Sequence, residues 1–138
     1  MQVILGAGGA IGNELAKELK NYTRKIRVVG RNPQKINYDD ELFVADLTQK
    51  EQVDEAVKGA KVAYLIVGLP YKIKVWQKQW PIVMKNTIEA CKKHKTKLVF
   101  FDNIYTFGMK FLCLLLLKAT GKKPNLFYMK LSQIMQNI

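Results

Sequence analysis

The chain has 138 residues, of which 49% are hydrophobic and 25% charged, a composition typical of one globular domain and not of a disordered segment. Its 23 lysine and arginine residues against 11 acids give a formal net charge of +12, which suits nucleic acid, a membrane surface or a phosphate-rich small ligand. Because the lysines occur as scattered pairs among apolar residues and no nucleic-acid-binding motif accompanies them, we expect no nucleic-acid partner.

The first half of the chain predicts three strands and two helices. Short apolar runs that stop at turn residues are typical of strands. Ile11, Leu15 and Leu19 follow the spacing of one helix face. Thr48 and Glu51 form a capping box that opens the second helix. The predicted elements are a strand at residues 2–5, a helix at 10–22, strands at 26–29 and 42–45, and a helix that ends at Gly59 in a left-handed cap.

The second half predicts two further strands around a long helix. The continuous apolar run at residues 62–67 is typical of a strand buried on both faces. Trp76 and Trp80 lie at the start of the helix, and Pro81 fits its first turn better than its interior. Residues 98–101 form the last strand, and this alternation favours a parallel sheet with right-handed crossovers. The packed stripe of the helix consists of Val83, Met84, Thr87, Ile88 and Cys91.

A glycine-rich turn, Gly-Ala-Gly-Gly-Ala-Ile-Gly, occupies residues 6–12 directly after the first strand. In such a turn Gly6 allows the tight bend, Gly9 lets a pyrophosphate approach the backbone, and Gly12 lets the helix lie against the sheet. The N–H groups and the positive dipole end of the helix then face the phosphates. The motif follows a strand and opens an amphipathic helix, so it predicts a dinucleotide site made by Gly6, Gly8, Gly9, Ala10, Ile11 and Gly12.

Three later strand ends supply further candidates for this site. Dinucleotide folds that bind NAD usually place an acid after the second strand, where this chain has Arg31, a residue that suits a 2′-phosphate. We therefore prefer NADP over NAD, although Arg31 also fits a solvated loop. Asp46, followed by Leu47, suits equally a hydrogen bond from the adenine amino group and a supporting role at the next helix. Gly68 ends the fourth strand and leaves room for the cofactor.

Together these segments resemble the extended or atypical short-chain dehydrogenase/reductase superfamily, and more narrowly its NAD-dependent epimerase/dehydratase group. The resemblance covers about residues 1–108 and rests on ILGAGGAIG, VVGRNP, ADLT, VGLPY and FFDNIYTFG. It implies an α/β fold with a Rossmann-type doubly wound parallel sheet and a bound dinucleotide. With about five strands predicted, we expect the sheet of this chain to be a truncated form of the family's. In whole family members it also implies oxidation or reduction of a hydroxyl or carbonyl group on a sugar nucleotide or similar substrate.

The chain departs from this family in its catalytic residues. With Gly108 as the point of alignment, Asn103 occupies the family's Ser or Thr position, and its amide can orient a substrate but cannot act as a hydroxyl. The family's Y-x-x-x-K pair, in which the lysine lowers the pKa of a tyrosine that donates a proton, is absent from the sequence. Tyr105 is a candidate acid by location alone, and packing at the sheet edge explains it better.

Residues 109–138 do not resemble the family's continuation, so we divide the chain into an NAD(P)-binding module at 1–108 and an atypical apolar and basic tail at 109–138, expected to be helical. The tail has five lysines and no acid. One hypothesis is a frameshifted or truncated gene product, and the alternative is a natural short form. In the latter, Leu112, Leu115, Leu116 and Ala119 have the spacing of a helix that packs on the sheet edge. Either way, an open edge predicts self-association.

The remaining patterns concern location and isolated residues. Cys91 and Cys113 lack the spacing of metal ligands, so we expect free thiols in a reducing compartment and no metal site. The N-terminus lacks the basic region of a secretory signal, and the apolar run at residues 111–117 is shorter than the roughly 20 residues of a membrane helix. We therefore predict a cytoplasmic protein. His94 is interpreted as a helix C-terminal residue that complements the dipole.

Three functions stay open on this evidence. The resemblance favours a nicotinamide-dependent epimerase, dehydratase or reductase. The intact glycine motif and the missing catalytic pair favour a catalytically silent NADP-binding or redox-sensing module. The tail favours a nonfunctional remnant. The residues themselves indicate binding of the cofactor more strongly than turnover.

Overall fold

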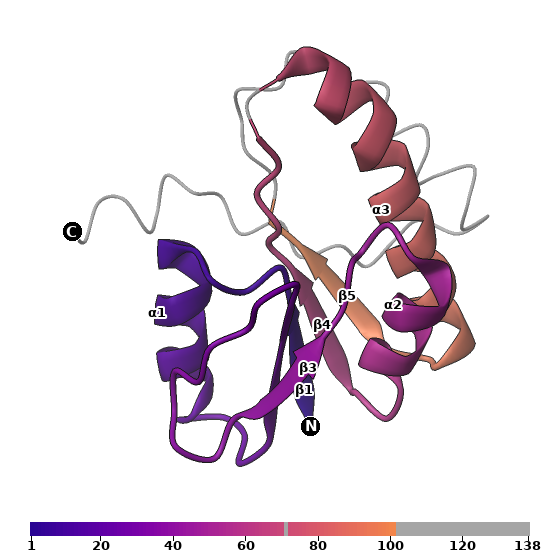
Figure 1. The fold of residues 1–138 in the computed structure, drawn as a ribbon. Coiled ribbons are helices and arrows are strands. Elements are labelled where there is room, and N and C mark those ends of the chain that lie inside the picture. Colours follow the sequence, from indigo (N-terminus) through magenta and orange to yellow (C-terminus); the bar gives the residue numbers. More distant parts are fainter. Residues whose placement is uncertain (71, 102–138) are drawn as a thin grey trace. The chain divides into compact units, whose positions relative to one another are not determined.

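The structure, a computed structural model, describes residues 1–70 and 72–101 of the chain. Strands and helices follow one another in the order that the sequence predicts, with small differences in their bounds (Figure 1). The elements are β1 (Gln2–Leu5), α1 (Ala10–Leu19), β2 (Ile26–Gly30), β3 (Glu41–Val44), α2 (Lys50–Val57), β4 (Val62–Leu65), α3 (Ile73–Lys93) and β5 (Lys97–Phe100). The predicted boundary at residue 108, the tail and Cys113 lie outside the described residues.

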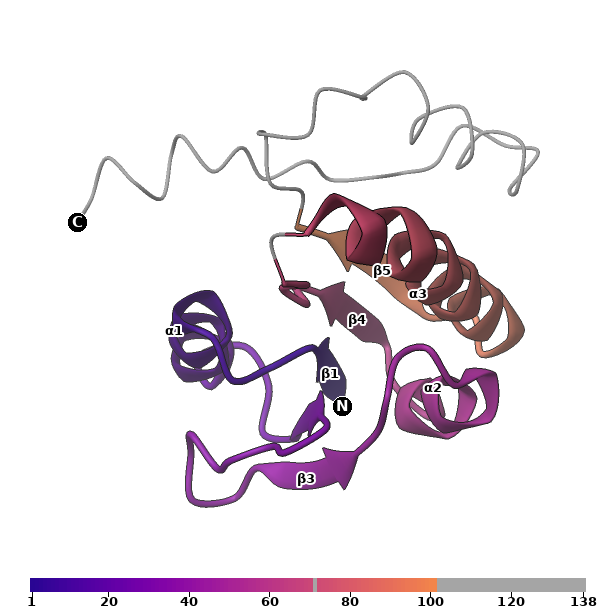
Figure 2. The ribbon, with the colours of Figure 1, turned by 45° about the horizontal axis from the view of Figure 1, so that its top comes forward.

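The five strands form one parallel sheet in the order β3-β2-β1-β4-β5, which confirms the predicted Rossmann-type architecture. In this sheet Gln2 lies opposite Ile26 on one side and opposite Val62 on the other. Figure 2 shows α1 on one face of the sheet and α2 and α3 on the other. The chain therefore winds outward in both directions from β1. The crevice between β1 and β4 is the switch point where doubly wound folds bind ligands.

The central strands are buried on both faces. On the side of α1, Ile4, Ile26 and Val28 pack against Ala16 and Leu19. Burial of such side chains contributes on the order of 1.5–3 kcal/mol each, so this cluster holds α1 against β1 and β2. On the opposite face the fully buried side chains are those of Val3, Leu5, Val29, Ala63 and Leu65.

Two sequence predictions, for the buried face of α1 and for the length and burial of β4, are wrong in detail. Ile11 is 45% exposed, because the buried residues of α1 are Gly12, Ala16 and Leu19. The apolar run that begins at Val62 is a strand only as far as Leu65, and burial alternates along it. Tyr64 is half-buried, and its hydroxyl donates to Gln2 Oε1 at 2.8 Å, so one face of β4 keeps a polar contact in place of full burial.

Pro81 lies in the interior of α3, which contradicts its predicted place in the first turn. The helix begins earlier than the proline because the backbone N–H groups of Val75 and Trp76 already donate to Lys72 O. Pro81 is exposed, so the carbonyl that loses its N–H donor lies on the solvent side of the helix. The predicted packed stripe of α3 is confirmed, since Val83, Met84, Thr87, Ile88 and Cys91 are all buried.

Trp76 and Trp80 lie in the first turns of α3. Their ring centroids are 6.4 Å apart in an edge-to-face arrangement, and Trp76 Nε1 donates to Pro70 O at 2.8 Å. Both side chains are half-buried. This geometry agrees with the predicted packing role, and it ties the loop after β4 to the helix that follows.

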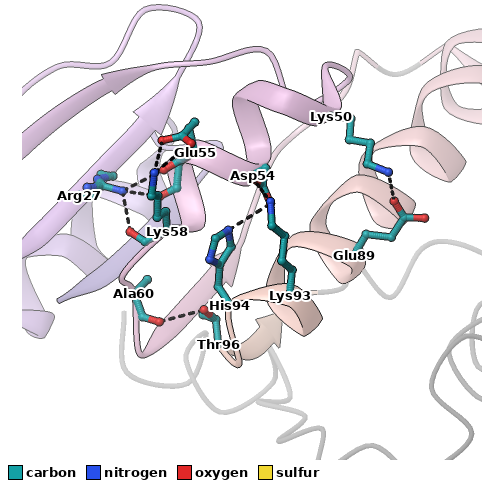
Figure 3. Close-up of polar contacts among 11 residues, drawn as sticks. Arg27, Lys50, Asp54, Glu55, Lys58, Ala60, Glu89, Lys93, His94 and Thr96 are labelled. Carbon is teal, nitrogen blue, oxygen red and sulfur yellow. Dashed lines mark hydrogen bonds and ion pairs between the residues drawn. The ribbon is translucent and has the colours of Figure 1, made fainter.

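Ion pairs join α2 to α3 along their shared side (Figure 3). Lys50 Nζ lies 2.8 Å from Glu89 Oε2. One turn further on, Asp54 pairs with Lys93 Nζ at 2.6 Å and with His94 Nε2 at 3.1 Å. The hydrogen bond from Lys93 is the main cause of the lowered pKa of Asp54. His94 is the C-cap of α3, as its predicted place at the helix end requires.

Cys91 is a free, buried thiol, and burial raises its pKa to about 12. A thiol with so high a pKa is almost never a thiolate at neutral pH, so Cys91 serves as a small core residue and not as a nucleophile. Within residues 1–70 and 72–101, no helix combines the length and the apolar character needed to cross a membrane.

The left-handed cap after α2 gives a test of the fold. Gly59 has φ +77°, and an added Cβ would meet only Met1 Cε, at 3.9 Å. We expect Gly59→Ala to lower the free energy of unfolding by about 1 kcal/mol, the cost of the left-handed region for a residue with a side chain. Urea unfolding measures it. Gly68→Ala is the matched control, because its Cβ would meet nothing within 4 Å and we expect almost no change.

Candidate functional site

The turn after β1 is held tightly between the two neighbouring strands. The backbone N–H groups of Gly6 and Ala7 both donate to Val29 O of β2, at 2.9 and 3.0 Å. Gly6 has φ +88°, and an added Cβ would lie 2.4 Å from Val67 Cα. No side chain fits at this position, so the bend predicted for Gly6 is a steric requirement.

The first turn of α1 opens onto solvent. Gly8 has φ +120°, and a Cβ on Gly8 or Gly9 would meet nothing within 4 Å. Gly9 is the N-cap of α1, and the helix has neither a side-chain cap nor an acid in its first turn. Ala10 and Ile11 are exposed beside it. The first N–H groups and the positive end of the helix dipole are therefore available to an anion.

Two glycines allow the close packing beneath this turn. A Cβ on Gly12 would lie 3.0 Å from Ile66 Cδ1, which agrees with the predicted approach of the helix to the sheet. A Cβ on Gly30 would lie 3.2 Å from Ala7 O. Gly30 follows the strand predicted at residues 26–29, and this contact was not predicted. The available signal was its position at the end of the strand that pairs with β1.

A compact turn follows β3. Asp46 Oδ1 accepts from the backbone N of Thr48 at 2.9 Å and from Thr48 Oγ1 at 2.8 Å. The predicted capping box between Thr48 and Glu51 is therefore wrong, since Gln49 is the N-cap of α2 and no side chain caps that helix. The physical reason is that α2 begins one residue later than the motif requires, so Thr48 precedes the N-cap position and its hydroxyl donates to Asp46.

The environment of Asp46 keeps its carboxylate ionised. The N–H of Thr48 is the first cause of its lowered pKa, followed by the Thr48 hydroxyl and, more weakly, by the positive charge of Arg31. Within residues 1–70 and 72–101, Oδ2 of Asp46 makes no hydrogen bond. One oxygen thus holds the turn and the other is left for a further donor, so the two roles weighed for Asp46 are compatible.

The other candidates differ in accessibility. Arg31 is exposed and makes no hydrogen bond or ion pair with the part of the chain that the structure describes. Leu47 points into the core with 6% exposure, and its carbonyl accepts from Asn86 Nδ2 at 3.1 Å. Gly68 is exposed after β4, and a Cβ there would meet nothing within 4 Å.

These residues share one edge of the sheet because the strands are parallel. The carboxyl ends of β1, β2, β3 and β4 carry, in turn, the glycine turn, Arg31, Asp46 and Gly68. The edge thus offers helix N–H groups, one unpaired guanidinium and one carboxylate oxygen, a set that suits a phosphate-containing ligand with a hydrogen-bond donor. The catalytic candidates Asn103 and Tyr105 lie outside the described residues.

A concave region is found between α2 and α3. There the described residues line an open cavity of about 600 Å³, and none of the predicted cofactor residues is among them. In the same part of the chain, no group of three His, Cys, Asp or Glu side chains is placed to hold a metal ion. The cavity is lined by Lys50, Glu51, Asp54, Glu55, Asn86, Glu89, Ala90 and Lys93.

Comparison with protein families gives one match. A family model described as NAD(P)H-binding matches residues 6–105, which is most of the chain. The matched region begins at the first glycine of the turn and includes every residue predicted for the cofactor site. No curated protein sequence matches the chain significantly.

Solved structures share the fold. Uronate dehydrogenase from Agrobacterium tumefaciens superposes with a TM-score of 0.68 at 20% identity, over 78% of this chain and 42% of that one. A Rossmann-fold NAD(P)-binding family protein from Shigella flexneri gives 0.59 at 24%, over 72% and 49%. A short-chain dehydrogenase/reductase superfamily protein from Agrobacterium tumefaciens with bound NAD gives 0.60 at 15%, over 72% and 31%. The chain thus spans less than half the length of these proteins.

The steric requirement at Gly6 is testable by substitution. We expect Gly6→Ala to cost more than about 2 kcal/mol of unfolding free energy, because its Cβ collides with the backbone of Val67 and its φ is positive. Gly9→Ala is the matched control, since its Cβ would meet nothing within 4 Å. Urea unfolding of both variants measures the difference. Equal stabilities would contradict the tight packing of this turn.

The charge of Asp46 predicts a pH dependence. Its folded-state pKa lies below the ordinary value of 3.8, so its ionised form stabilises the fold above pH 3.8, and that stabilisation is lost as the pH falls through the folded-state pKa. We expect Asp46→Asn to lower the unfolding free energy at pH 7 and to lose this difference in acid. Urea unfolding across that range measures it. A difference that stays constant with pH would mean that the charge contributes nothing.

Proposed function

This chain belongs to the NAD(P)H-binding family, and we propose that it binds NADP in preference to NAD at the carboxyl edge of its sheet. The single observation that carries the proposal is the start of α1. An uncapped helix N-terminus without an acid in its first turn follows a turn whose glycines leave open space above the backbone. Such an end attracts the pyrophosphate of a dinucleotide through its N–H groups and its dipole.

Each strand end has a proposed contact with the nucleotide. Gly8, Gly9, Ala10 and Ile11 would face the pyrophosphate, with Gly6 and Gly12 shaping the turn beneath it. Gly68 would leave room for the part of the cofactor that crosses the end of β4. Leu47 would contribute through its backbone, since its side chain is buried.

Specificity for NADP rests on the end of β2. Arg31 is exposed and makes no hydrogen bond or ion pair with residues 1–70 and 72–101, and its guanidinium suits bidentate contact with a 2′-phosphate. No acid occupies that position to bond a ribose 2′-hydroxyl. Oδ2 of Asp46 is proposed to accept a hydrogen bond from the adenine amino group, which would place the adenine between the ends of β2 and β3.

The nicotinamide ring, when bound, supplies hydride transfer, and two of the structural neighbours are named as dehydrogenases of sugar acids. An oxidoreductase acting on a hydroxyl or carbonyl group is the activity that the resemblance to the short-chain dehydrogenase/reductase superfamily implies. The missing Y-x-x-x-K pair supports, as the second candidate, a module that binds NADP without turning it over. Asn103 and Tyr105 are proposed only as groups that would orient or protonate a substrate in the first case.

Titration with NADPH and NADH, read by calorimetry and thermal shift, tests the proposal. A ligand that binds only the folded state raises the melting temperature. We expect NADPH to bind the more tightly, and Arg31→Ala to weaken NADPH by roughly tenfold or more while leaving NADH almost unchanged. Lys35→Ala is the matched control, a nearby exposed cation whose Nζ already donates to Tyr38 O.

Three outcomes separate the alternatives. NADPH binding that Gly9→Trp abolishes supports the site, and turnover of NADPH with carbonyl substrates then separates the oxidoreductase from the silent module. If the parent chain binds NADPH and NADH with equal affinity, and Arg31→Ala changes neither affinity, the proposed preference for NADP is wrong. No shift with either nucleotide would favour a remnant that keeps the glycine motif without using it.

A further inference from the structure

We infer that Asn86, in the middle of α3, is a positioning residue for the adenine end of the nucleotide. The inference rests on the proposed function and adds a residue that lies far from the glycine motif in sequence. Asn86 is 6% exposed, and its Nδ2 donates to Leu47 O at 3.1 Å. This bond links α3 to the turn that follows β3.

The turn at residues 46–49 is fixed at several points. Inside it, Oδ1 of Asp46 accepts both donors of Thr48, and the N–H of Gln49 donates to Asp46 O at 2.9 Å. From α2, Gln52 Oε1 accepts from the N–H of Asp46 at 2.7 Å. From α3, Asn86 supplies the one contact to the Leu47 carbonyl that the described residues contain. Because Thr48 holds Oδ1 of Asp46, the direction in which Oδ2 points is set by the position of the whole turn.

Other contacts also join the two helices. Lys50–Glu89 and Asp54–Lys93 already join α2 and α3 one and two turns further along the same side, as Figure 3 shows. Asn86 makes the contact that comes first along this series, next to the carboxyl edge of the sheet. A buried amide is costly unless it is bonded, and an apolar residue would fill the same space without that cost. A polar group here therefore points to a role in setting the turn.

The consequence for binding is geometric. Oδ2 of Asp46 and the guanidinium of Arg31 are proposed to flank the adenine ribose end of NADP. Loss of the Asn86 bond frees the Leu47 carbonyl and lets the turn shift, so Oδ2 moves relative to Arg31. The affinity of the adenine end falls even though Asn86 itself touches no part of the ligand.

The variant Asn86→Asp tests this step, because it keeps the size of the side chain while its carboxylate cannot donate and repels the Leu47 carbonyl. The probes are NADPH and 2′,5′-ADP, a fragment with only the adenine end, titrated by calorimetry below the melting temperature of every variant. We expect the affinities for NADPH and for 2′,5′-ADP to fall by the same factor of about ten. Because the two ligands share only the adenine end, an equal loss places the defect there. In the unliganded chain we expect faster amide exchange at Thr48 and Gln49.

The control is Thr96→Val, which removes a bond of the same kind elsewhere. Thr96 is 7% exposed and follows the C-terminal end of α3, where its Oγ1 donates to Ala60 O at 2.8 Å. We expect it to lower the melting temperature while leaving both affinities unchanged. If the effect were one of stability, the two variants would behave alike in binding. If Asn86 positions the turn, binding weakens in Asn86→Asp alone.

Two results would overturn the inference. Unchanged nucleotide affinity in Asn86→Asp, with the parent chain binding normally, removes Asn86 from the site and leaves the proposed function standing. Equal weakening by Thr96→Val reduces the effect to stability. Absence of binding to the parent chain defeats the proposed function itself, and the amide exchange of the unliganded Asn86→Asp variant still reports whether the bond sets the turn.

Discussion

The first turn passes so close to the end of β4 that no side chain fits at Gly6, and this contact fixes where α1 begins. Because Gly6 has no side chain, the backbone passes against Val67 and bonds to β2 in the same few residues. This narrow passage brings the start of α1 directly over the point where the strand order reverses. A wider turn would move the helix end away from the crevice, and the open N–H groups would no longer face a place where a ligand can lie.

The proposed site is built differently on its two sides. The side proposed for the phosphates consists of backbone, and glycines give it its shape because they carry no side chains. The side proposed for the adenine consists of side chains held by other side chains, with Asp46 fixed by Thr48 and the whole turn tied to α2 and α3. The first kind of construction is visible in a sequence as a motif. The second depends on residues from three separate elements that meet only after folding.

This difference explains how far the sequence could be interpreted. The order of elements, the glycine turn and the packed stripe of α3 follow from local spacing, and the structure agrees with them. The capping box failed because α2 begins one residue later than the motif requires, and the start of a helix is not fixed by the motif alone. Pro81 was misplaced because its cost in a helix interior depends on which side meets solvent. Asn86 gave no local signal at all, since its partner, Leu47, lies on a different element.

The edge-to-face pair of Trp76 and Trp80 in α3 gives the chain an intrinsic fluorescence signal. Trp76 and Trp80 are the two tryptophans that the sequence contains, so its indole fluorescence arises from one short stretch of helix. The indole of Trp76 is bonded to the carbonyl of Pro70, in the loop that leaves β4. When the six tyrosines are left unexcited, the emission of this chain therefore reports the state of that loop at the sheet's carboxyl edge, with no label attached.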